Sequence, residues 1–314
     1  MNNIFITGGT GFLGTHIISE RLRTTEDTVY TLVRGESPEQ AEKYQFSQLK
    51  KVIEPGILDQ KEIRSRVNIC VGDIAQPWLG LETRELELLN EKIDYIYNSA
   101  AVTDLNLELE KIRKINVNGT RNVLDFAEAC CKRGQLKKVN HISTAYVFGN
   151  KVCTFRETDL NIGQGFNNTY EQSKFEAEEA VMQYREKGLD IDIFRPSIIL
   201  GDSKTGKTTN FKMFYQPLHF FSMELFDKIP AFTHSKPNLV NVCSPGDKII
   251  VVRGGKFGER FGDIAKAYGV DVIPAGCAMG QWALPGVYKR SPQAKSRRER
   301  LLHDSLRDVY GYSL

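Results

Sequence analysis

Thr7-Gly8-Gly9-Thr10-Gly11-Phe12-Leu13-Gly14 is the stretch of sequence that decides the fold. It follows the apolar run Ile4-Phe5-Ile6 and precedes a run with helical spacing, so a glycine-rich turn joins a strand to a helix. The three glycines at G-x-x-G-x-x-G spacing permit a tight turn, a close approach of backbone to a pyrophosphate, and close packing of the helix on the strand. The first turn of that helix presents free N–H groups to an anion. The stretch alone fits a dinucleotide-binding turn or an ordinary glycine-rich turn.

The composition indicates a globular protein without a membrane span. The chain has 314 residues, of which 41% are hydrophobic and 26% charged, with a net charge of +3. No apolar run approaches the roughly 20 residues of a membrane span, and Met1 leads into a strand without a signal segment. The six cysteines lack C-x-x-C spacing and the five histidines are scattered. We therefore expect a cytoplasmic protein with reduced, mostly buried thiols and no metal site.

Strand and helix patterns alternate over roughly the first 200 residues. The strand-like runs are residues 3–6, 28–33, 67–71, 95–98, 138–142 and 192–199. Helical patterns include residues 11–23, 113–132 and 170–186. This alternation predicts an α/β fold with a Rossmann-type, doubly wound parallel sheet, which binds ligands at the carboxyl ends of its strands.

Candidate cofactor contacts follow the ends of these predicted strands. Arg34, after the second strand, is suited to the 2′-phosphate of NADP, where an acidic residue would bind the ribose of NAD; a solvated arginine is the alternative. Asp73, after the third strand, is suited to the adenine edge or to capping the next helix. Ser99, Ala100 and Ala101 follow the fourth strand, and their small side chains let a cofactor lie against the backbone.

A second group of residues points to proton transfer. Tyr170 and Lys174 are spaced i, i+4, so one face of a predicted helix carries both. A lysine ammonium one turn away is expected to lower the pKa of a tyrosine from its ordinary value of about 10. Ser143 and Thr144 end the fifth strand, which places their hydroxyls at the edge where ligands bind. Tyr-x-x-x-Lys alone is common on exposed helices, but its order after the other motifs favours a catalytic site.

Five motifs occur in a fixed order along the chain. They are the glycine turn at 7–14, Asn116-Val117-Asn118-Gly119-Thr120, His141-Ile142-Ser143-Thr144-Ala145-Tyr146-Val147, Tyr170 with Lys174, and Arg195-Pro196-Ser197-Ile198-Ile199-Leu200-Gly201. In this combination the chain resembles the extended short-chain dehydrogenase/reductases over about three-quarters of its length. Ser143 to Val147 and the pair Val33-Arg34 are most similar to the thioester-reductase and fatty acyl-CoA reductase branch.

This resemblance implies an oxidoreductase that prefers NADP(H) to NAD(H). Thr144, rather than Ser143, would hydrogen-bond the carbonyl oxygen, Tyr170 would protonate it, and Lys174 would tune Tyr170 and hold the nicotinamide ribose. The implied cofactor-binding residues are Thr7, Gly8, Gly11, Phe12, Leu13, Gly14, Arg34, Asp73, Ile74, Ser99, Ala100, Ala101, Asn116, Tyr170, Lys174 and Pro196. The substrate would be a thioester on coenzyme A or an acyl carrier protein, reduced to an aldehyde. A homodimer would form through the helices around 113–132 and 170–186.

Three other functions fit parts of the chain. A nucleotide-sugar epimerase or dehydratase shares the glycine turn, the hydroxyl, Tyr170 and Lys174. A catalytically impaired, cofactor-binding fragment of a larger reductase–aminotransferase fusion is the second. The third is an NTPase, because residues 201–208 match the P-loop pattern G-x-x-x-x-G-K-[ST]. No acidic strand end supplies a magnesium partner for that loop, which in the resembling family lines the mouth of the substrate site.

The family pattern stops near residue 240. We therefore expect an NADP(H)-binding domain over 1–240, a strand–turn–helix–strand unit over 241–275 and a basic tail over 276–314. Residues of the middle part resemble a fragment of class V PLP-dependent aminotransferases, but no lysine lies in a Schiff-base motif, so we do not expect PLP. The basic run of the tail lacks interleaved aromatic residues, so we expect no nucleic-acid partner and no membrane contact.

Overall fold

The computed structural model describes residues 1–53, 55–134, 136–151, 153–199 and 208–209, and short strands at 242–243, 250–253 and 273–276. The chain divides into two compact units, Met1–Pro196 and Ser197–Leu314. The P-loop-like stretch 201–207 and most of the predicted segments 241–275 and 276–314 lie outside the described residues. The predicted division of the chain near residue 240 stays a prediction.

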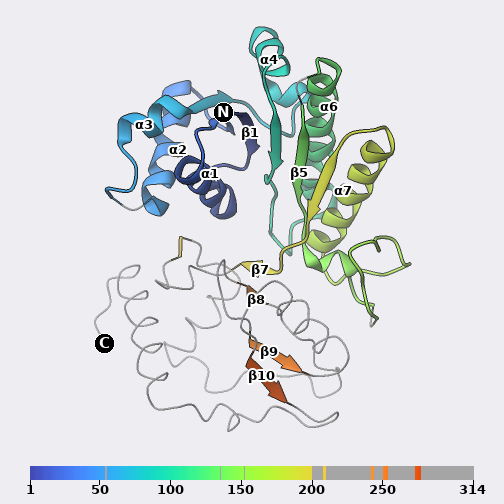
Figure 1. The fold of residues 1–314 in the computed structure, drawn as a ribbon. Coiled ribbons are helices and arrows are strands. Elements are labelled where there is room, and N and C mark those ends of the chain that lie inside the picture. The colour runs from blue at the N-terminus through green and yellow to red at the C-terminus, as the bar shows by residue number, and fades with distance from the viewer. Residues whose placement is uncertain are drawn as a thin grey trace, which may run out of the picture. The chain divides into compact units, whose positions relative to one another are not determined.

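A six-stranded parallel sheet forms the centre of the first unit (Figure 1). Its strands are β1 (Asn3–Thr7), β2 (Thr28–Val33), β3 (Val67–Val71), β4 (Tyr95–Asn98), β5 (Lys138–Ile142) and β6 (Ile191–Phe194). They lie in the order β3-β2-β1-β4-β5-β6, and every neighbouring pair is parallel. The order reverses between β1 and β4, which opens a ligand-binding crevice at their carboxyl ends. The predicted Rossmann-type sheet is confirmed.

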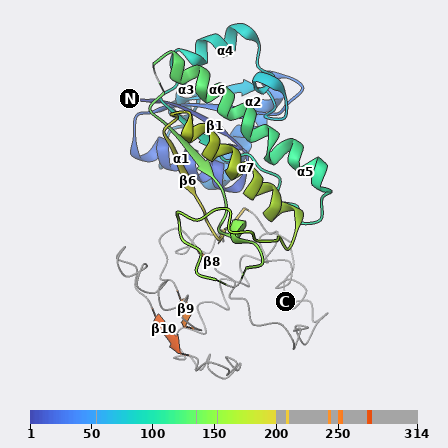
Figure 2. The same ribbon diagram turned by 90° about the vertical axis from the view of Figure 1, so that its right-hand side faces the viewer.

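Helices cover both faces of this sheet (Figures 1 and 2). One face carries α1 (Phe12–Thr24), α2 (Pro38–Val52) and α3 (Gln60–Arg66). The other carries α4 (Thr83–Asn90), α5 (Leu109–Asn116), α6 (Asn118–Lys132) and α7 (Thr169–Glu186), with short 3₁₀ turns at Pro77–Gly80 and Ala145–Phe148. Successive side chains of β1 serve the two cores: Phe5 packs on Phe126 of α6, and Ile6 packs with Ile18 of α1. No helix in the described part of the chain is long and apolar enough to cross a membrane.

Two predicted elements have different bounds in the structure. The helix predicted over 113–132 is two helices, because α5 ends at Asn116 and α6 begins at Asn118. Gly119 lies against Ile74 so closely that a Cβ at this glycine would be 2.7 Å from the Ile74 Cδ1. The strand predicted over 192–199 ends at Phe194, since Pro196 has no N–H to continue the ladder.

The second unit contains short parallel pairs among its described residues. β7 (Ile198–Ile199) pairs with β8 (Val242–Cys243), and β9 (Ile250–Arg253) pairs with β10 (Ile273–Gly276). Parallel pairing of β9 and β10 is the geometry that a strand–turn–helix–strand unit requires. The residues that join these two strands lie outside the described part, so the aminotransferase resemblance stays a prediction.

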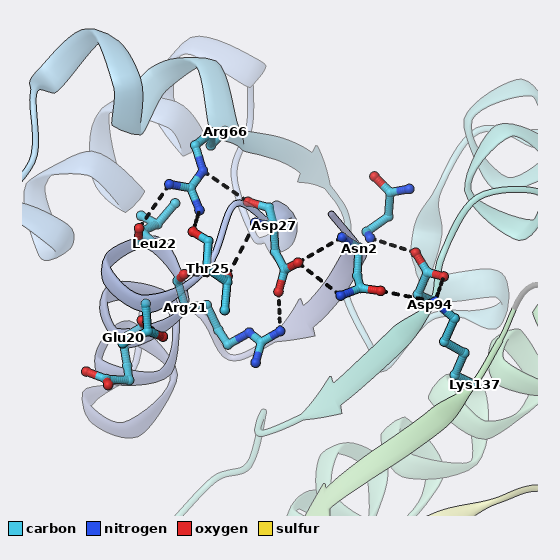
Figure 3. Close-up of polar contacts among 11 residues, drawn as sticks. Asn2, Glu20, Arg21, Leu22, Thr25, Asp27, Arg66, Asp94 and Lys137 are labelled. Carbon is cyan, nitrogen blue, oxygen red and sulfur yellow. Dashed lines mark hydrogen bonds and ion pairs between the residues drawn. The ribbon is translucent and has the colours of Figure 1, made fainter.

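Buried polar side chains fasten the end of the sheet opposite the crevice (Figure 3). Arg66, at the end of α3, is buried, and its guanidinium donates to the carbonyls of Leu22 at 2.9 Å, Asp27 at 3.1 Å and Thr25. The carbonyls of Leu22 and Thr25 belong to the last turn and the C-cap of α1, where a helix has no partners of its own. Arg66 therefore holds the rear end of α1 against the start of β2.

Asp27 is the charged residue on which the acid stability of this network depends. Burial raises the pKa of its carboxyl, but hydrogen bonds from Asn2, Thr25 and Arg21, with the Arg21 charge, outweigh burial and leave the pKa below its ordinary value. A carboxyl with a lowered native pKa stabilises the fold above the unfolded pKa of about 3.9 and loses that contribution as the pH falls through the native pKa. We expect D27N to lower the free energy of unfolding by about 1.5–3 kcal/mol at pH 7.

The effect should shrink as the pH falls below about 4, because the Asp27 carboxyl of the unfolded chain is then protonated while that of the native state follows at lower pH. Urea unfolding at pH 7 and at pH 3 measures both values. D192N is the control, since Asp192 is exposed and pairs with Lys138 at 3.0 Å at the surface; its cost should be at most about 1 kcal/mol. Equal losses for the two variants would contradict the assignment.

Candidate active site

The glycine turn between β1 and α1 brings backbone from two neighbouring strands together. Gly8 has a φ of +72°, and a Cβ there would lie 2.7 Å from the amide nitrogen of Ala100, which follows β4. A Cβ at Gly14 would overlap the carbonyl oxygen of Gly8. Gly11, the N-cap of α1, offers no side-chain cap, and the first turn holds no acidic residue. The first N–H groups of α1 are therefore available to an anion.

Gln45 of α2 supports this turn, and sequence reasoning missed it. Its side chain is fully buried, donates through Nε2 to the carbonyl of Gly9 at 3.0 Å, and accepts through Oε1 from the Thr31 hydroxyl at 3.2 Å. The Thr15 hydroxyl donates to the carbonyl of Gly11 at 2.6 Å. In the sequence, Gln45 stands out only as a polar residue on the apolar face of α2. This pattern does not show which groups the side chain would bond.

A buried chain of polar side chains links β1, β4 and β5 at their carboxyl ends. The Thr7 hydroxyl donates to Asn98 Oδ1 at 2.9 Å and accepts from the Ala100 amide at 3.2 Å. The Asn98 side-chain amide faces His141 Nδ1 at 3.2 Å. Burial, with the charge of Lys174 second, holds the pKa of His141 well below its usual range. His141 is therefore neutral, and the predicted residues Thr7 and Ala100 lie together on the crevice.

The predicted catalytic residues also meet at this edge of the sheet. Asn168 caps α7 by accepting from the amide of Glu171 at 2.9 Å, so Tyr170 lies in the first turn of that helix. The Tyr170 hydroxyl hydrogen-bonds with Thr144, which follows β5. Lys174 is buried one turn further along, and its Nζ donates to the carbonyl of Ile142 at 2.7 Å.

The protonation of this pair differs from the prediction. Burial raises the pKa of Tyr170 to about 12, which the hydrogen bond with Thr144 opposes in part. Burial lowers the pKa of Lys174 to about 8, and the charge of Glu178 opposes that shift. The expectation that Lys174 brings the tyrosine pKa below its ordinary value is wrong for this structure, because burial of the Tyr170 hydroxyl dominates and the charges of Tyr146 and Glu171 add to the upward shift. Near neutral pH Tyr170 is a neutral hydroxyl, which is the form that donates a proton.

Asn116 holds the start of α7 in place. Its amide accepts from the N–H of Val102 at 2.8 Å and donates to the Val102 carbonyl at 2.9 Å. It also donates to the Ser173 hydroxyl at 2.9 Å, and that hydroxyl donates to the carbonyl of Tyr170 at 2.8 Å. Its side chain is occupied by protein groups, and a cofactor contact for Asn116 stays a prediction.

The remaining predicted cofactor residues differ in their surroundings. Arg34 is exposed directly after β2, and its side chain makes no hydrogen bond or ion pair within the part of the chain that the structure describes. Asp73 Oδ1 accepts from the amide of Ala75 at 2.9 Å in a local turn, whereas the N-cap of the next helical turn, Pro77–Gly80, is Gln76. Neither the adenine contact nor the helix-capping alternative is shown by this bond. The Ile74 side chain is buried against Gly119, so only its backbone is left for a ligand.

The other predicted positions lie around the same crevice. Phe12 and Leu13 open α1 and are half-buried, Ser99 is half-buried, and Ala101 is exposed. The carbonyl of Pro196 accepts from the amide of Ala145 at 2.9 Å, which places this last predicted residue beside the loop of Thr144. Among the four cysteines whose burial the structure describes, Cys70 and Cys130 are buried free thiols and Cys131 and Cys153 are exposed, so the expectation of mostly buried thiols is met by two of these four.

Comparisons with known families and curated proteins agree with this geometry. The family model described as "Male sterility protein", an NAD-binding family, matches residues 6–244. One of the proteins that form the linear gramicidin synthase of Brevibacillus parabrevis is 31% identical over 206 residues, which is 64% of this chain and 4% of that protein. Fatty acyl-CoA reductase wat of Drosophila melanogaster is 29% identical over 228 residues, covering 63% of this chain and 43% of that protein.

Solved structures of reductase domains are similar as well. The terminal R domain of the myxalamid PKS-NRPS pathway has a TM-score of 0.60 and 31% identity, over 68% of this chain and 53% of that chain. An archaeal thiolation-reductase di-domain from a non-ribosomal peptide synthetase has a TM-score of 0.59 and 27% identity, over 70% and 46% of the two chains. This chain thus spans about half, or less, of the proteins it matches.

UDP-glucuronic acid 4-epimerase of Bacillus cereus shares the fold. Its structure has a TM-score of 0.52 and 22% identity, over 71% of this chain and 63% of that chain. At this identity the likeness shows a common architecture and nothing about the substrate.

Proposed function

Since this chain belongs to the Male sterility protein family, an NAD-binding family of extended short-chain reductases, we propose that it reduces an acyl thioester to an aldehyde with NADPH. The observation that carries the proposal is the meeting of Tyr170, Thr144 and Lys174 at the carboxyl edge of the sheet, beside the uncapped start of α1. Tyr170, Thr144 and Lys174 would thus face the carbonyl of the substrate, while the first N–H groups of α1 would face a phosphate of the cofactor.

The residues around the crevice fit a dinucleotide. The space beside Gly8 admits no side chain, and the first N–H groups of α1 have no acidic neighbour that would repel a pyrophosphate. Arg34 is free to pair with a 2′-phosphate, because no described residue engages it. These features support NADP(H) over NAD(H).

When bound, NADPH supplies the hydride that adds to the thioester carbonyl carbon. Tyr170, a neutral hydroxyl near pH 7 because burial raises its pKa to about 12, donates its proton to the carbonyl oxygen. Thr144 hydrogen-bonds the same oxygen and stabilises the charge that develops on it. Lys174 holds the ribose and favours return of a proton to Tyr170. The resulting hemithioacetal breaks its carbon–sulfur bond, releasing a thiol and an aldehyde.

The acyl group would arrive on a pantetheine arm, either of coenzyme A or of a carrier protein. Similarity to a thiolation-reductase di-domain supports the carrier protein, and similarity to a fatty acyl-CoA reductase supports coenzyme A. A direct test incubates the purified chain with NADPH and either an acyl-CoA or an acylated carrier protein. We expect loss of absorbance at 340 nm and an aldehyde that can be trapped as its hydrazone.

Three results would contradict this function. Turnover of a UDP-sugar without net consumption of NADPH would favour the epimerase. Tight NADPH binding with no aldehyde from any acyl thioester would favour a cofactor-binding fragment that is catalytically impaired. ATP binding that survives substitution of Gly8 and Gly11 would favour the P-loop interpretation of residues 201–208.

A substitution at Arg34 tests the choice of cofactor. We expect R34Q to raise the dissociation constant for NADPH roughly 10- to 100-fold, the effect of one charge-assisted contact, and to leave NADH binding unchanged. Fluorescence titration with each cofactor measures both. R84Q is the matched control, because Arg84 is likewise an exposed arginine but belongs to α4 and does not follow a strand of the sheet. An unchanged NADPH constant in R34Q would exclude a phosphate contact.

The outer face of α5, α6 and α7 is where a homodimer would form. It carries a shallow polar hollow across which Arg113 of α5 pairs with Glu176 of α7 at 2.6 Å. Arg121 and Glu179 line the same hollow, so positive and negative side chains alternate across a face that would meet its own copy. Light scattering on the purified chain tests this; a mass of one chain at all concentrations would contradict it.

A further inference from the structure

A fully buried carboxylate lies next to the candidate catalytic residues, and the reaction proposed above gives it no role. Glu178 of α7 has 0% of its surface exposed. One carboxylate oxygen accepts from the Ser143 hydroxyl at 2.6 Å, and the other is paired with the Arg195 guanidinium. Ser143 directly precedes Thr144, and Glu178 lies one helical turn after Lys174. The carboxylate thus lies against the elements that carry all three reacting side chains, because Thr144 follows Ser143 and α7 carries both Tyr170 and Lys174.

We propose that Glu178 is a positioning residue of this active site, which fixes the Ser143-Thr144 turn to α7 and supplies the negative charge beside buried Lys174. The proposal rests on the reductase function proposed above. Burying a carboxylate is costly unless it is paired and hydrogen-bonded. Glu178 meets both conditions, because Arg195 donates to it at 2.9 Å and Ser143 at 2.6 Å.

Arg195 fixes this carboxylate from the end of β6. It follows β6 and also donates to the carbonyls of Asp159 at 2.8 Å and Glu157 at 3.2 Å. The amide of Ser143 donates to the carbonyl of Phe194 at 2.7 Å, and the amide of Ala145 to that of Pro196. The ends of β5 and β6 and the middle of α7 therefore come together at Glu178. The contacts of Glu178 with Ser143 and Arg195 fix the position of Thr144 relative to α7.

The charge of Glu178 acts on Lys174 more than any other described ionisable group does. Burial lowers the pKa of Lys174 to about 8, and Glu178 supplies the opposing charge. His141 of β5 faces the lysine as a neutral ring. Other carboxylates of α7 bond elsewhere. Glu176 pairs with Arg113 of α5, Glu171 accepts from Asn167, and Glu179 accepts from Asn161. Without Glu178, the ammonium form of Lys174 would lose its counter-charge in a buried site.

The test is the pH dependence of NADPH binding from pH 7 to pH 10, measured by fluorescence titration, which needs no acyl substrate. Wild type should lose affinity as Lys174 loses its proton. In E178Q we expect this loss to begin about one pH unit lower, so that near pH 8 the affinity is up to tenfold weaker than that of wild type. E179Q is the matched control, because Glu179 is the next residue of α7 and is bonded to Asn161 near the surface; its profile should match wild type.

E178Q leaves the half-buried Arg195 without its carboxylate, and this variant can fail to fold. The double variant E178L/R195M removes both charges together, which cores tolerate better, and it should shift the profile in the same direction. The proposal is overturned if a variant that folds has the same pH dependence of NADPH binding as wild type. It is also overturned if the NADPH affinity of the wild-type protein itself does not change between pH 7 and 10. Absence of NADPH binding by wild type would instead overturn the proposed function, so the two failures are distinguishable.

If turnover can be measured, S143A separates the two roles of Glu178, which are the positioning of Thr144 and the supply of a negative charge beside Lys174. This change keeps the carboxylate and removes only the hydroxyl that ties it to the turn of Thr144. We expect kcat to fall about tenfold with KM for the thioester unchanged, because a misplaced hydrogen-bond donor weakens the transition state alone. Unchanged kcat in S143A would remove the positioning role of the contact.

Discussion

Replacing Tyr170 with phenylalanine should lower kcat for thioester reduction by about 10²–10⁴-fold while the dissociation constant for NADPH changes little. The substitution removes one hydroxyl, which is the proton donor in the proposed reaction and the partner of Thr144. The ring stays, so the packing of α7 on the sheet is kept. Stopped-flow absorbance at 340 nm measures the rate, and cofactor fluorescence measures the binding.

Tyr184 provides a matched control on the same helix. Its hydroxyl is bonded to Asp125 of α6, on the far part of α7 from the crevice. Y184F removes the same atom from the same kind of residue, so it should cost about 1 kcal/mol of stability and leave kcat unchanged. A Y170F rate within tenfold of wild type, or equal effects in the two variants, would mean that Tyr170 is not the proton donor.

The second large effect is expected at Gly8. In G8A the new Cβ would lie 2.7 Å from the amide nitrogen of Ala100 while the backbone keeps a φ of +72°. The positive φ costs about 1–2 kcal/mol and the forced contact about 1–3 kcal/mol. Because β1 and the turn after β4 must separate to accept the methyl group, NADPH affinity should fall more than about 100-fold. Urea unfolding and cofactor titration measure the two effects.

A substitution at Gly134 separates the cost of a positive φ from the cost of the close contact that a Cβ makes at Gly8. Gly134 has a φ of +79°, similar to that of Gly8, and no heavy atom lies within 4 Å of the position its Cβ would take. G134A should therefore cost about 1 kcal/mol of stability and leave NADPH binding as it is in wild type. If G8A and G134A behave alike, the close approach of Gly8 to Ala100 has no part in binding.

Apolar patterning was enough to predict the sheet. The strands over 28–33, 67–71, 95–98 and 138–142 have the predicted bounds, because each is a short apolar run ended by polar or turn residues. The break between α5 and α6 was missed, since helical periodicity continues through Val117 and that residue keeps helical backbone angles between the two helices. Pro196 ends β6 through its missing N–H, a signal that the sequence did contain.

The residues of the candidate site that belong to a sequence motif could be predicted. The residues that hold them in place through contacts with distant parts of the chain could not. Tyr170, Lys174 and Thr144 were found from spacing and strand ends. Gln45 and Glu178 were not, because their partners lie 36 and 35 residues away along the chain and no local pattern pairs them. The pKa of Tyr170 was predicted with the wrong sign, since spacing shows the neighbouring lysine but not how deeply the pair is buried.

The N-terminus of helix α1 has no side-chain cap, whereas its C-terminus is held by Arg66. This difference decides which substitutions would stabilise the protein without weakening cofactor binding. An aspartate or serine at Gly11 would cap the N-terminus and contribute about 1 kcal/mol to folding. Selection for thermal resistance alone would favour that change. The same side chain would occupy the N–H groups that a pyrophosphate needs, so the gain in robustness would come with a loss of affinity. Arg66 already immobilises the rear of α1, which lets the front remain an exposed, prearranged docking point.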